Sequence, residues 1–359
     1  MSEFITRRKA ITQGIVTTGA LCSAGCSKSE KNEISKSPNA DSHPPFLTPW
    51  SPPSDLKRDL TPGSTPVRLG AWSRGHTTLD YPTDISITDM VKRIRDAGYT
   101  TGNSSYGQSG RNPWLEASDS EIAELKTALK TYDVTFFDMH TYTNNIHPDL
   151  ETRAKNHRYV IEQCEAAERV GCPMVTTHTG TCSAEHPISP HKDNWTWDTW
   201  KLGVKVIKQL LQDTSGMNVV FGIEAVNMTA SNNPRAHLRL IEDVADPRLK
   251  ICLDPVNMMH LGVYYRNTEL IQECFDLLGE NIIACHAKDT YILPDKMSAY
   301  ITELAPGKGI LDYETYLVGL SRLSTPRPLL IEHIPDEQYA DAKKYIEDTA
   351  AKVGVKIYG

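Results

Sequence analysis

The sequence lacks the excess of basic residues that proteins acting on polyanions use to attract their targets. Its 359 residues include 38 Lys and Arg against 45 Asp and Glu, which gives a formal net charge of −7. This balance provides no overall attraction to nucleic acid or to an anionic membrane. A function on DNA is therefore disfavoured, although a local basic patch would be compatible with it.

Two recognisable motifs are also missing. No G-x-G-x-x-G follows the first candidate strand, which counts against a dinucleotide-binding open sheet. The cysteines beyond residue 26 show no C-x-x-C spacing, and a chain of this size needs no disulfide framework. We therefore predict free thiols at Cys164, Cys172, Cys182, Cys252, Cys274 and Cys285.

The N-terminal apolar stretch, residues 11–26, is too short and too polar to span a bilayer. It follows TRRKAI (6–11), and this combination resembles a twin-arginine export signal. We expect residues 1–26 to direct the protein to the periplasm, the alternative being a disordered basic tail. SAGC (23–26) resembles a lipoprotein processing site, so the signal is either simply cleaved or leaves a membrane anchor at Cys26.

Residues 27–66 are rich in Ser, Pro, Lys and Asp and have almost no periodic apolar pattern. The segment HPPFLTPWSPP (43–53) would break any helix and most strands. We predict a tether or a surface arm here, followed by a catalytic domain over residues 67–359.

From residue 67 onward, short apolar runs alternate with amphipathic stretches. The predicted strands are 67–73, 99–105, 134–140, 173–179, 218–225, 249–255, 281–288 and 327–333. The clearest predicted helices are 119–132, 149–171, 199–213 and 266–280. Eight such strands alternating with helices favour a (β/α)₈ TIM barrel, for which roughly 250 residues is typical. A doubly wound open sheet is the alternative.

The last four predicted strands each end in a residue of a metal-ligand type: Glu224, Asp254, His286 and Glu332. Alone, each would more often be a helix cap, a salt-bridge partner or a core residue. The ends of barrel strands meet at one face, however, and neighbouring strands lie about 4.8 Å apart. Four uncompensated polar groups there would cost several kcal/mol each, whereas one divalent cation compensates them all. Three oxygen ligands and one nitrogen ligand favour Mn²⁺, with Zn²⁺ or Mg²⁺ as alternatives.

This order of Glu, Asp, His and Glu resembles the xylose isomerase-like TIM barrels, the sugar phosphate isomerase/epimerase family. The resemblance implies that Glu224, Asp254, His286 and Glu332 hold Mn²⁺, Mg²⁺, Co²⁺ or Zn²⁺ beneath a sugar's carbonyl and adjacent hydroxyl. It also implies that Glu224 and Glu332 transfer protons on opposite faces of the substrate. Barrels of this family often pair, so a homodimer is expected.

Three positions depart from the ketose 3-epimerases of that family. Asn257 stands where those enzymes have His, Ala230 where they have Glu, and Ile292 where they have Arg. The metal ligands are retained while these positions that grip the substrate are not. Epimerisation of a free ketose is therefore left open.

Other polar residues near strand ends are candidates for contacts with a substrate. His140 and His178 end the third and fourth strands and are candidate acid/base groups, or alternatively core residues. Lys288 is two residues after His286, so both side chains point to the same face of the predicted strand. Lys288 therefore either meets a substrate oxygen or pairs with Asp289. The remaining candidates for substrate contacts are Asn257, His260, Trp114, and Lys308 in the loop APGKGILDY (305–313).

The favoured function is a metal-dependent isomerase or epimerase that removes a proton next to the carbonyl of an unphosphorylated carbohydrate. Export favours a substrate without phosphate. A lyase of the same fold, performing β-elimination on 3-keto glycosides, is the main alternative. A metal-dependent endonuclease is disfavoured by the charge and the export signal, and we expect no nucleic-acid partner. A non-catalytic sugar-binding barrel would not need opposed carboxylates.

The export signal is testable by replacing both Arg7 and Arg8 with Lys. The precursor of this double variant should accumulate in the cytoplasm, because the twin-arginine route reads the arginine pair. Cell fractionation and immunoblotting measure the outcome, and unchanged export would refute the signal. Loss of lipid labelling in Cys26→Ala would establish the anchor.

Overall fold

The structure, a computed structural model, describes residues 44, 51–72, 78–104 and 112–358. All of them belong to one unit, Asp41–Gly359. The predicted export signal, including Cys26, lies outside the described residues.

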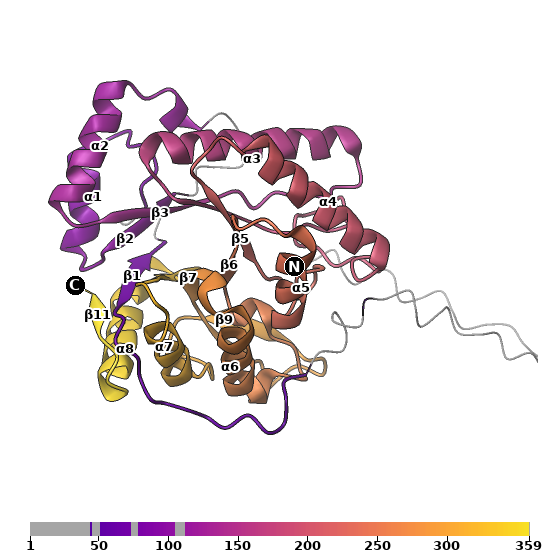
Figure 1. Cartoon of the computed structure of the whole chain (residues 1–359). Helices are drawn as coiled ribbons and strands as arrows, with labels where there is room; N and C mark the ends of the chain where they lie inside the picture. The colour runs from indigo at the N-terminus through magenta and orange to yellow at the C-terminus, as the bar shows by residue number, and fades with distance from the viewer. Residues whose placement is uncertain (1–43, 45–50, 73–77, 105–111, 359) are drawn as a thin grey trace, which may run out of the picture. The chain divides into compact units, whose positions relative to one another are not determined.

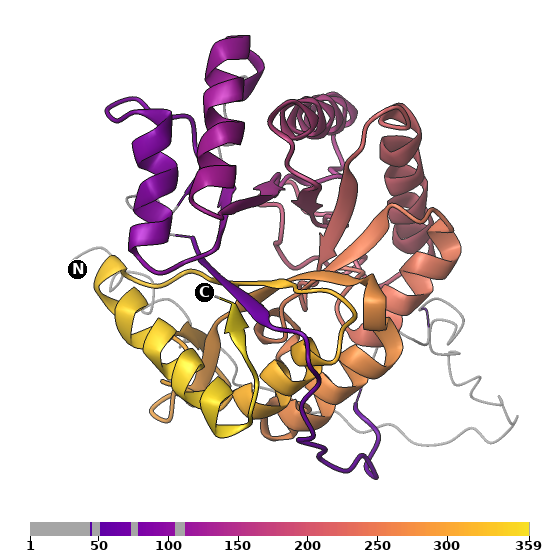
Figure 2. The same ribbon diagram turned by 60° about the vertical axis from the view of Figure 1, so that its left-hand side comes forward.

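Eight parallel strands form a closed barrel (Figures 1 and 2). Each strand pairs with its neighbours along the chain, and the last pairs with the first, with Leu69 opposite Leu329. The predicted (β/α)₈ barrel is confirmed, and the open sheet is excluded. The strands are β1 (Val67–Ala71), β2 (Thr101–Ser104), β3 (Thr135–His140), β4 (Met174–Thr177), β5 (Val220–Glu224), β6 (Leu249–Leu253), β7 (Ile282–Ala287) and β10 (Pro328–Ile331).

Eight α-helices lie around the outside of the strands in the described chain (Figure 2). They are α1 (Ile87–Asp96), α2 (Asp119–Thr131), α3 (Leu150–Val170), α4 (Trp197–Asp213), α5 (Pro234–Val244), α6 (Asn267–Leu278), α7 (Tyr313–Ser321) and α8 (Tyr339–Lys352). Short 3₁₀ turns are η2 (Pro113–Leu115), η3 (Val256–Met258), η4 (Tyr264–Arg266), η5 (Gly279–Asn281) and η6 (Asp336–Gln338). No described helix is both long and apolar enough to cross a membrane.

The helix ends are fixed by capping residues that can be recognised in the sequence. At the start of α3 the Asp149 carboxylate accepts the N–H of Thr152 at 2.8 Å. The helix ends at Gly171, whose φ of 78° is left-handed and therefore suits glycine. Helix α2 begins with a reciprocal capping box between Ser118 and Glu121. The four predicted helices consequently agree with the structure to within two residues at each end.

The barrel carries apolar residues on both faces of its sheet. The main core, which includes Leu69, Leu329 and Ile331, packs between the strands and the helices. A second small cluster consists of Met174, Cys252 and Ala284 from β4, β6 and β7. Side chains alternate between the faces of a strand, so Cys252 lies on the same face as Asp254, inside the barrel. Described cysteines are all free thiols, as predicted.

An antiparallel hairpin of β8 (Asp289–Ile292) and β9 (Ile301–Leu304) follows β7 and was not predicted. The loop after β9, residues 305–313 with the candidate Lys308, is tied to the hairpin by Asp289. This carboxylate accepts N–H groups of Gly307, Gly309 and Leu311 at 3.0, 2.9 and 2.9 Å. A Cβ at Gly309 would lie only 2.2 Å from the Thr290 carbonyl oxygen, so the loop packs closely.

The described part of the predicted arm, residues 51–66, runs along α6 and α7 (Figure 1, indigo). The Arg58 guanidinium lies 2.6 Å from Asp312 and 2.8 Å from Glu314 at the start of α7. Arg322, just after α7, donates to the Thr61 carbonyl at 2.7 Å. At the other end of the chain, β11 (Ile357–Tyr358) pairs with β1.

Replacing Asp289 by Asn should destabilise the barrel by about 2 kcal/mol. Both carboxylate oxygens of Asp289 now accept hydrogen bonds from backbone N–H groups, and the NH₂ group of Asn cannot accept them. Urea unfolding followed by circular dichroism measures the change. Asp295→Asn is the control, since Asp295 is exposed and pairs with Lys296 at 2.9 Å. Equal stability of the two variants would contradict the anchoring role of Asp289.

Candidate metal centre

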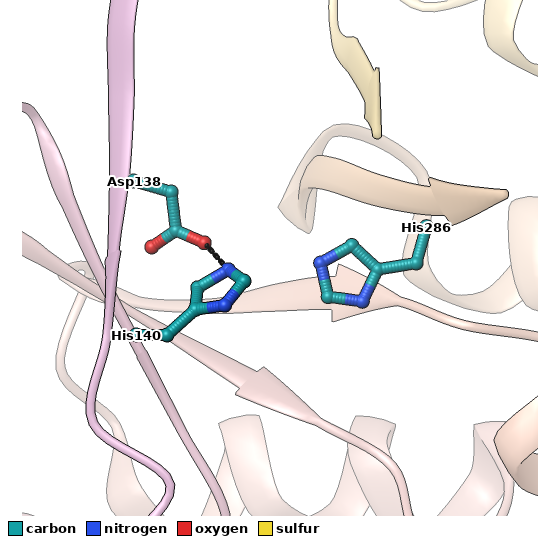
Figure 3. A group of neighbouring side chains, drawn as sticks. All are labelled: Asp138, His140 and His286. Atoms are coloured by element: carbon teal, nitrogen blue, oxygen red, sulfur yellow. Dashed lines mark ion pairs between the residues drawn. The ribbon is translucent and has the colours of Figure 1, made fainter. Parts of the chain in front are cut away.

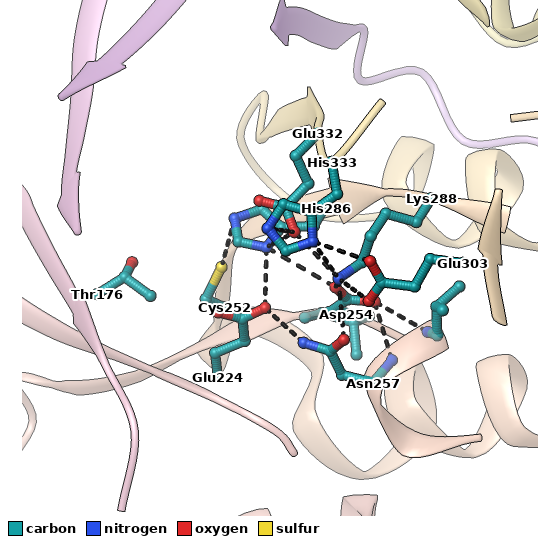
Figure 4. Close-up of polar contacts among 12 residues, drawn as sticks. Thr176, Glu224, Cys252, Asp254, Asn257, His286, Lys288, Glu303, Glu332 and His333 are labelled. Carbon is teal, nitrogen blue, oxygen red and sulfur yellow. Dashed lines mark hydrogen bonds and ion pairs between the residues drawn. The ribbon is translucent and has the colours of Figure 1, made fainter. Parts of the chain in front are cut away.

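Four predicted ligands converge inside one end of the barrel (Figure 4). Glu224 ends β5, Asp254 follows β6, His286 lies in β7 and Glu332 follows β10. One potential ligand atom from each lies within 4.8 Å of the others. All four side chains are buried, none more than 2% exposed.

The imidazole of His286 lies at the middle of this group. Its Nδ1 is 3.0 Å from Glu224 Oε1, 3.2 Å from Glu332 Oε1 and 3.9 Å from Asp254 Oδ2. The other oxygen of Asp254, Oδ1, accepts the N–H groups of Val256 and Asn257 at 2.9 and 3.2 Å. The turn after β6 therefore directs Oδ2 of Asp254 toward the centre.

The donor set fits a divalent cation. Oδ2 of Asp254 and both carboxylate oxygens of Glu332 are buried and receive no well-oriented hydrogen bond from the described residues, although Lys288 lies within ion-pair distance of Asp254 Oδ2 and Glu332 Oε1. Burying such groups without compensation is costly. Carboxylate oxygens and one imidazole nitrogen are ligands that Mn²⁺, Mg²⁺ and Zn²⁺ accept.

Lys288 supplies a positive charge beside the cluster. Its Nζ is 2.9 Å from Asp254 Oδ2, 3.2 Å from Glu332 Oε1 and 3.0 Å from Glu303 Oε1. Burial lowers the pKa of this ammonium, but the carboxylates outweigh burial and raise that pKa well above its ordinary value. Of the two sequence expectations, pairing with Asp289 is wrong, because Asp289 holds the loop after β9.

The three carboxylates differ in how readily they ionise. Burial opposes ionisation of Glu224 and Glu332, yet His286 and neighbouring cations hold the pKa of each below its usual range. Burial together with those two carboxylates raises the pKa of Asp254 to about 6, despite the attraction of Lys288. Asp254 is therefore the carboxylate of the cluster whose ionisation is most strongly opposed.

A buried ion pair that includes a residue not predicted from the sequence, Asp138, lies beside this cluster (Figure 3). His140 Nε2 is 2.5 Å from Oδ2 of Asp138, and the Thr176 hydroxyl donates to the same oxygen at 2.8 Å. Asp138, His140 and His286 also have potential ligand atoms within 4.8 Å. We interpret Asp138 and His140 as an ion pair separate from the four converging residues, because His140 Nε2 lies directly against the Asp138 carboxylate.

Aromatic rings pack against the candidate histidines. His178 Nε2 is 3.6 Å from Glu224 Oε2, and the Tyr142 ring stacks on His178 with 4.7 Å between centroids. The Trp72 ring lies 5.7 Å from His140. Both predicted acid/base histidines are therefore close to the ligand cluster.

Of the described residues predicted to contact a substrate, Asn257 contacts the ligand cluster, whereas Lys308 does not. Asn257 bridges the centre, since it donates to Glu224 Oε1 at 2.8 Å and accepts from Lys288 at 2.9 Å. His260 is partly buried after η3, where its Nδ1 accepts the N–H of Gly262 at 3.1 Å. Lys308 is exposed on the turn that Asp289 anchors, and no contact joins it to the four ligands within the described residues.

The position of Trp114 contradicts its prediction as a substrate contact. Its side chain is fully buried in the main core, and its Nε1 donates to the Leu79 carbonyl at 3.0 Å. The prediction that this ring meets a substrate is therefore wrong. Among the described tryptophans, Trp72 is the one whose ring lies against His140 and His333.

Glu303 and His333 are two further residues that the sequence analysis did not assign to the site. Glu303, on β9, lies 3.0 Å from Lys288 and 2.9 Å from His333 Nδ1. His333 directly follows Glu332 and has a left-handed φ of 58°, an uncommon conformation for a residue with a side chain. Its position after a ligand was a usable signal, whereas Glu303 depends on the unpredicted hairpin.

Comparison with known proteins gives a matching family, a curated relative and solved structures of similar fold. A family model described as "Xylose isomerase-like TIM barrel" matches residues 91–350. The probable endonuclease 4 of Campylobacter concisus (strain 13826) is 27% identical over 160 residues. That match covers 43% of this chain and 54% of the relative, so it spans about half the length of that protein.

Three solved structures share the fold at low identity. A D-tagatose 3-epimerase-like protein is 16% identical, with 75% of this chain and 95% of that chain covered and a TM-score of 0.55. A xylose isomerase-like TIM barrel protein from Mycobacterium smegmatis, in complex with magnesium, is 14% identical (81% and 97% covered, TM-score 0.55). Endonuclease IV from Thermus thermophilus is also 14% identical (79% and 99% covered, TM-score 0.59).

Glu332→Gln should weaken Mn²⁺ binding at least about tenfold while the barrel stays folded, because the change removes a ligand charge but keeps the side-chain shape. Isothermal titration of chelator-stripped protein with Mn²⁺ measures the affinity, and circular dichroism checks the fold. Glu337→Gln, an exposed position, is the matched control. Unchanged affinity in Glu332→Gln would remove Glu332 from the site.

Proposed function

Because this chain belongs to the xylose isomerase-like TIM barrel family, we propose that it is a divalent-metal-dependent sugar isomerase or epimerase. The reaction would begin by removal of a proton from carbon next to a carbonyl. The observation that carries the proposal is the buried convergence of Glu224, Asp254, His286 and Glu332 at strand ends. In such barrels this end of the strands is where active sites lie.

The four converging residues would hold the ion, with Mn²⁺ favoured by their donor set and Mg²⁺, Zn²⁺ or Co²⁺ as alternatives. When bound, such an ion supplies a Lewis acid that stabilises negative charge on a carbonyl and an adjacent hydroxyl. Magnesium accompanies the similar protein from Mycobacterium smegmatis, which supports a hard divalent cation.

Glu224 and Glu332 are proposed as the proton-transfer pair. They come from β5 and β10, with β6 and β7 between them in the barrel, so they approach a bound molecule from different sides. The pKa values of both carboxylates lie below the usual range, so both are ionised near neutral pH, which is the form that can accept a proton. His178, next to Glu224, and His140 are further acid/base candidates.

The surroundings of the centre favour a substrate other than a free ketose. Asn257, where 3-epimerases of the family have His, is committed to Glu224 and Lys288. Ala230 and Ile292 also lack the groups that grip a ketose. We propose an unphosphorylated sugar derivative, and a periplasmic site of action in which the protein is either released or anchored through Cys26. A homodimer is proposed from the resemblance alone.

A lyase acting on 3-keto glycosides would share the first proton transfer and then expel the aglycone. A metal-dependent endonuclease is a second candidate function, favoured by the similarity to the Campylobacter endonuclease. The net charge of −7 argues against it, because binding a DNA backbone relies on positive charge. Small-molecule chemistry therefore remains the first proposal.

Turnover in D₂O distinguishes these functions. Keto-sugars and 3-keto glycosides are incubated with the manganese-loaded protein, and the products are examined by NMR and mass spectrometry. An isomerase or epimerase should place deuterium on the carbon next to the carbonyl, since the carboxylate that removed the proton exchanges it with solvent. A lyase should release the aglycone and leave an ultraviolet-absorbing unsaturated keto-sugar.

Glu224→Gln and Glu332→Gln should each abolish the exchange while retaining sugar binding. Exchange surviving in both variants would move the base elsewhere, with His178 and then His140 as the next residues to replace. Product formation without deuterium would indicate a hydride shift. Nicking of duplex DNA containing an abasic site, with no sugar turnover, would favour the endonuclease instead.

A further inference from the structure

The two nitrogens of His286 lie in different surroundings (Figure 4). Nδ1 faces the three carboxylates, with Glu224 Oε1 at 3.0 Å and Glu332 Oε1 at 3.2 Å. Nε2, on the other side of the ring, lies 3.4 Å from Sγ of Cys252. Both His286 and Cys252 are fully buried, so no solvent is available to complete their hydrogen bonding.

Strand β6 supplies both the thiol and one of the ligands. Cys252 and Asp254 are two residues apart and therefore project from the same face of the strand. Cys252 is registered against Glu224 on β5 and against Ala284 on β7. Its thiol thus lies one layer deeper in the barrel than the Asp254 carboxylate.

A histidine nitrogen that binds a metal carries no proton, so the other nitrogen carries it and needs an acceptor. That acceptor is usually a carboxylate, a backbone carbonyl or water. In the part of the chain that the structure describes, the hydrogen-bond partner of His286 Nε2 is the Cys252 sulfur. A buried thiol keeps its own proton at neutral pH and accepts through a sulfur lone pair.

We propose that Cys252 is a positioning residue for the metal-binding His286. Its sulfur accepts the Nε2–H and so holds the imidazole with Nδ1 directed at the ion. This role rests on the metal site of the proposed function. It assigns a task to a cysteine that apolar packing with Met174 and Ala284 would otherwise account for fully.

Three substitutions separate hydrogen bonding from packing. Cys252→Ala removes both the acceptor and the volume, Cys252→Val keeps apolar volume without an acceptor, and Cys252→Ser keeps an acceptor of similar size. If the sulfur positions His286, Ala and Val should each weaken Mn²⁺ binding by roughly tenfold to a hundredfold. Ser should stay within about threefold of the wild-type affinity, because its hydroxyl accepts the same hydrogen bond.

Mn²⁺ affinity is measured on chelator-stripped protein by isothermal titration, with circular dichroism as the check of folding. Cys274→Ala, a fully buried cysteine on α6 beside Met258, is the matched control and should bind as wild type. Wild-type affinity in Cys252→Ala or Cys252→Val would overturn the proposal, as would Ser binding as weakly as Ala. If Ala does not fold, the comparison of Val with Ser decides. Absence of Mn²⁺ binding by the wild type would refute the metal site itself.

Discussion

Three carboxylates buried together at one end of the barrel are the constraint on which the rest of the site depends. Strands β5, β6 and β10 bring Glu224, Asp254 and Glu332 to one buried point, where negative charges repel one another and solvent cannot screen them. Each nearby polar contact reduces that repulsion or fixes an oxygen. Lys288 pairs with two of the three, backbone amides hold Oδ1 of Asp254, and Asn257 donates to Glu224.

These compensations reach outward to parts of the chain far from the strand ends. Lys288 is shared with Glu303, so the β8–β9 hairpin is electrostatically linked to the centre. Asp289, next to Lys288, fixes the loop that follows the hairpin through backbone amides. Lys288 and Asp289, the two residues after β7, therefore connect the four converging residues to the hairpin and the hairpin to the loop after it. A substitution in the hairpin would consequently affect the centre without touching a ligand.

The barrel and the convergence of four polar residues at strand ends could be predicted because both depend on local patterns. Apolar runs identify the strands, and a polar residue at the end of each run identifies an inward position at the open face. The side chains that surround these four residues could not be predicted in the same way. Glu303, Asp138 and Cys252 come close to them only in the folded chain. Trp114 shows the converse error, because an aromatic side chain gives no sequence signal that separates a core ring from a substrate-facing one.

The fold alone does not decide between the candidate functions, because similar barrels include an epimerase-like protein and an endonuclease. The candidate functions therefore have to be distinguished by the residues at and around the four predicted ligands. A cation-binding cluster needs only its ligands and a charge balance, whereas proton transfer needs ionised carboxylates on different sides of a substrate. Glu224 and Glu332 would meet that need, because the pKa values of both lie below the usual range and two strands separate them in the barrel. As metal ligands both residues would also serve a protein that only binds sugar, so the argument for an enzyme is their approach to a bound molecule from different sides.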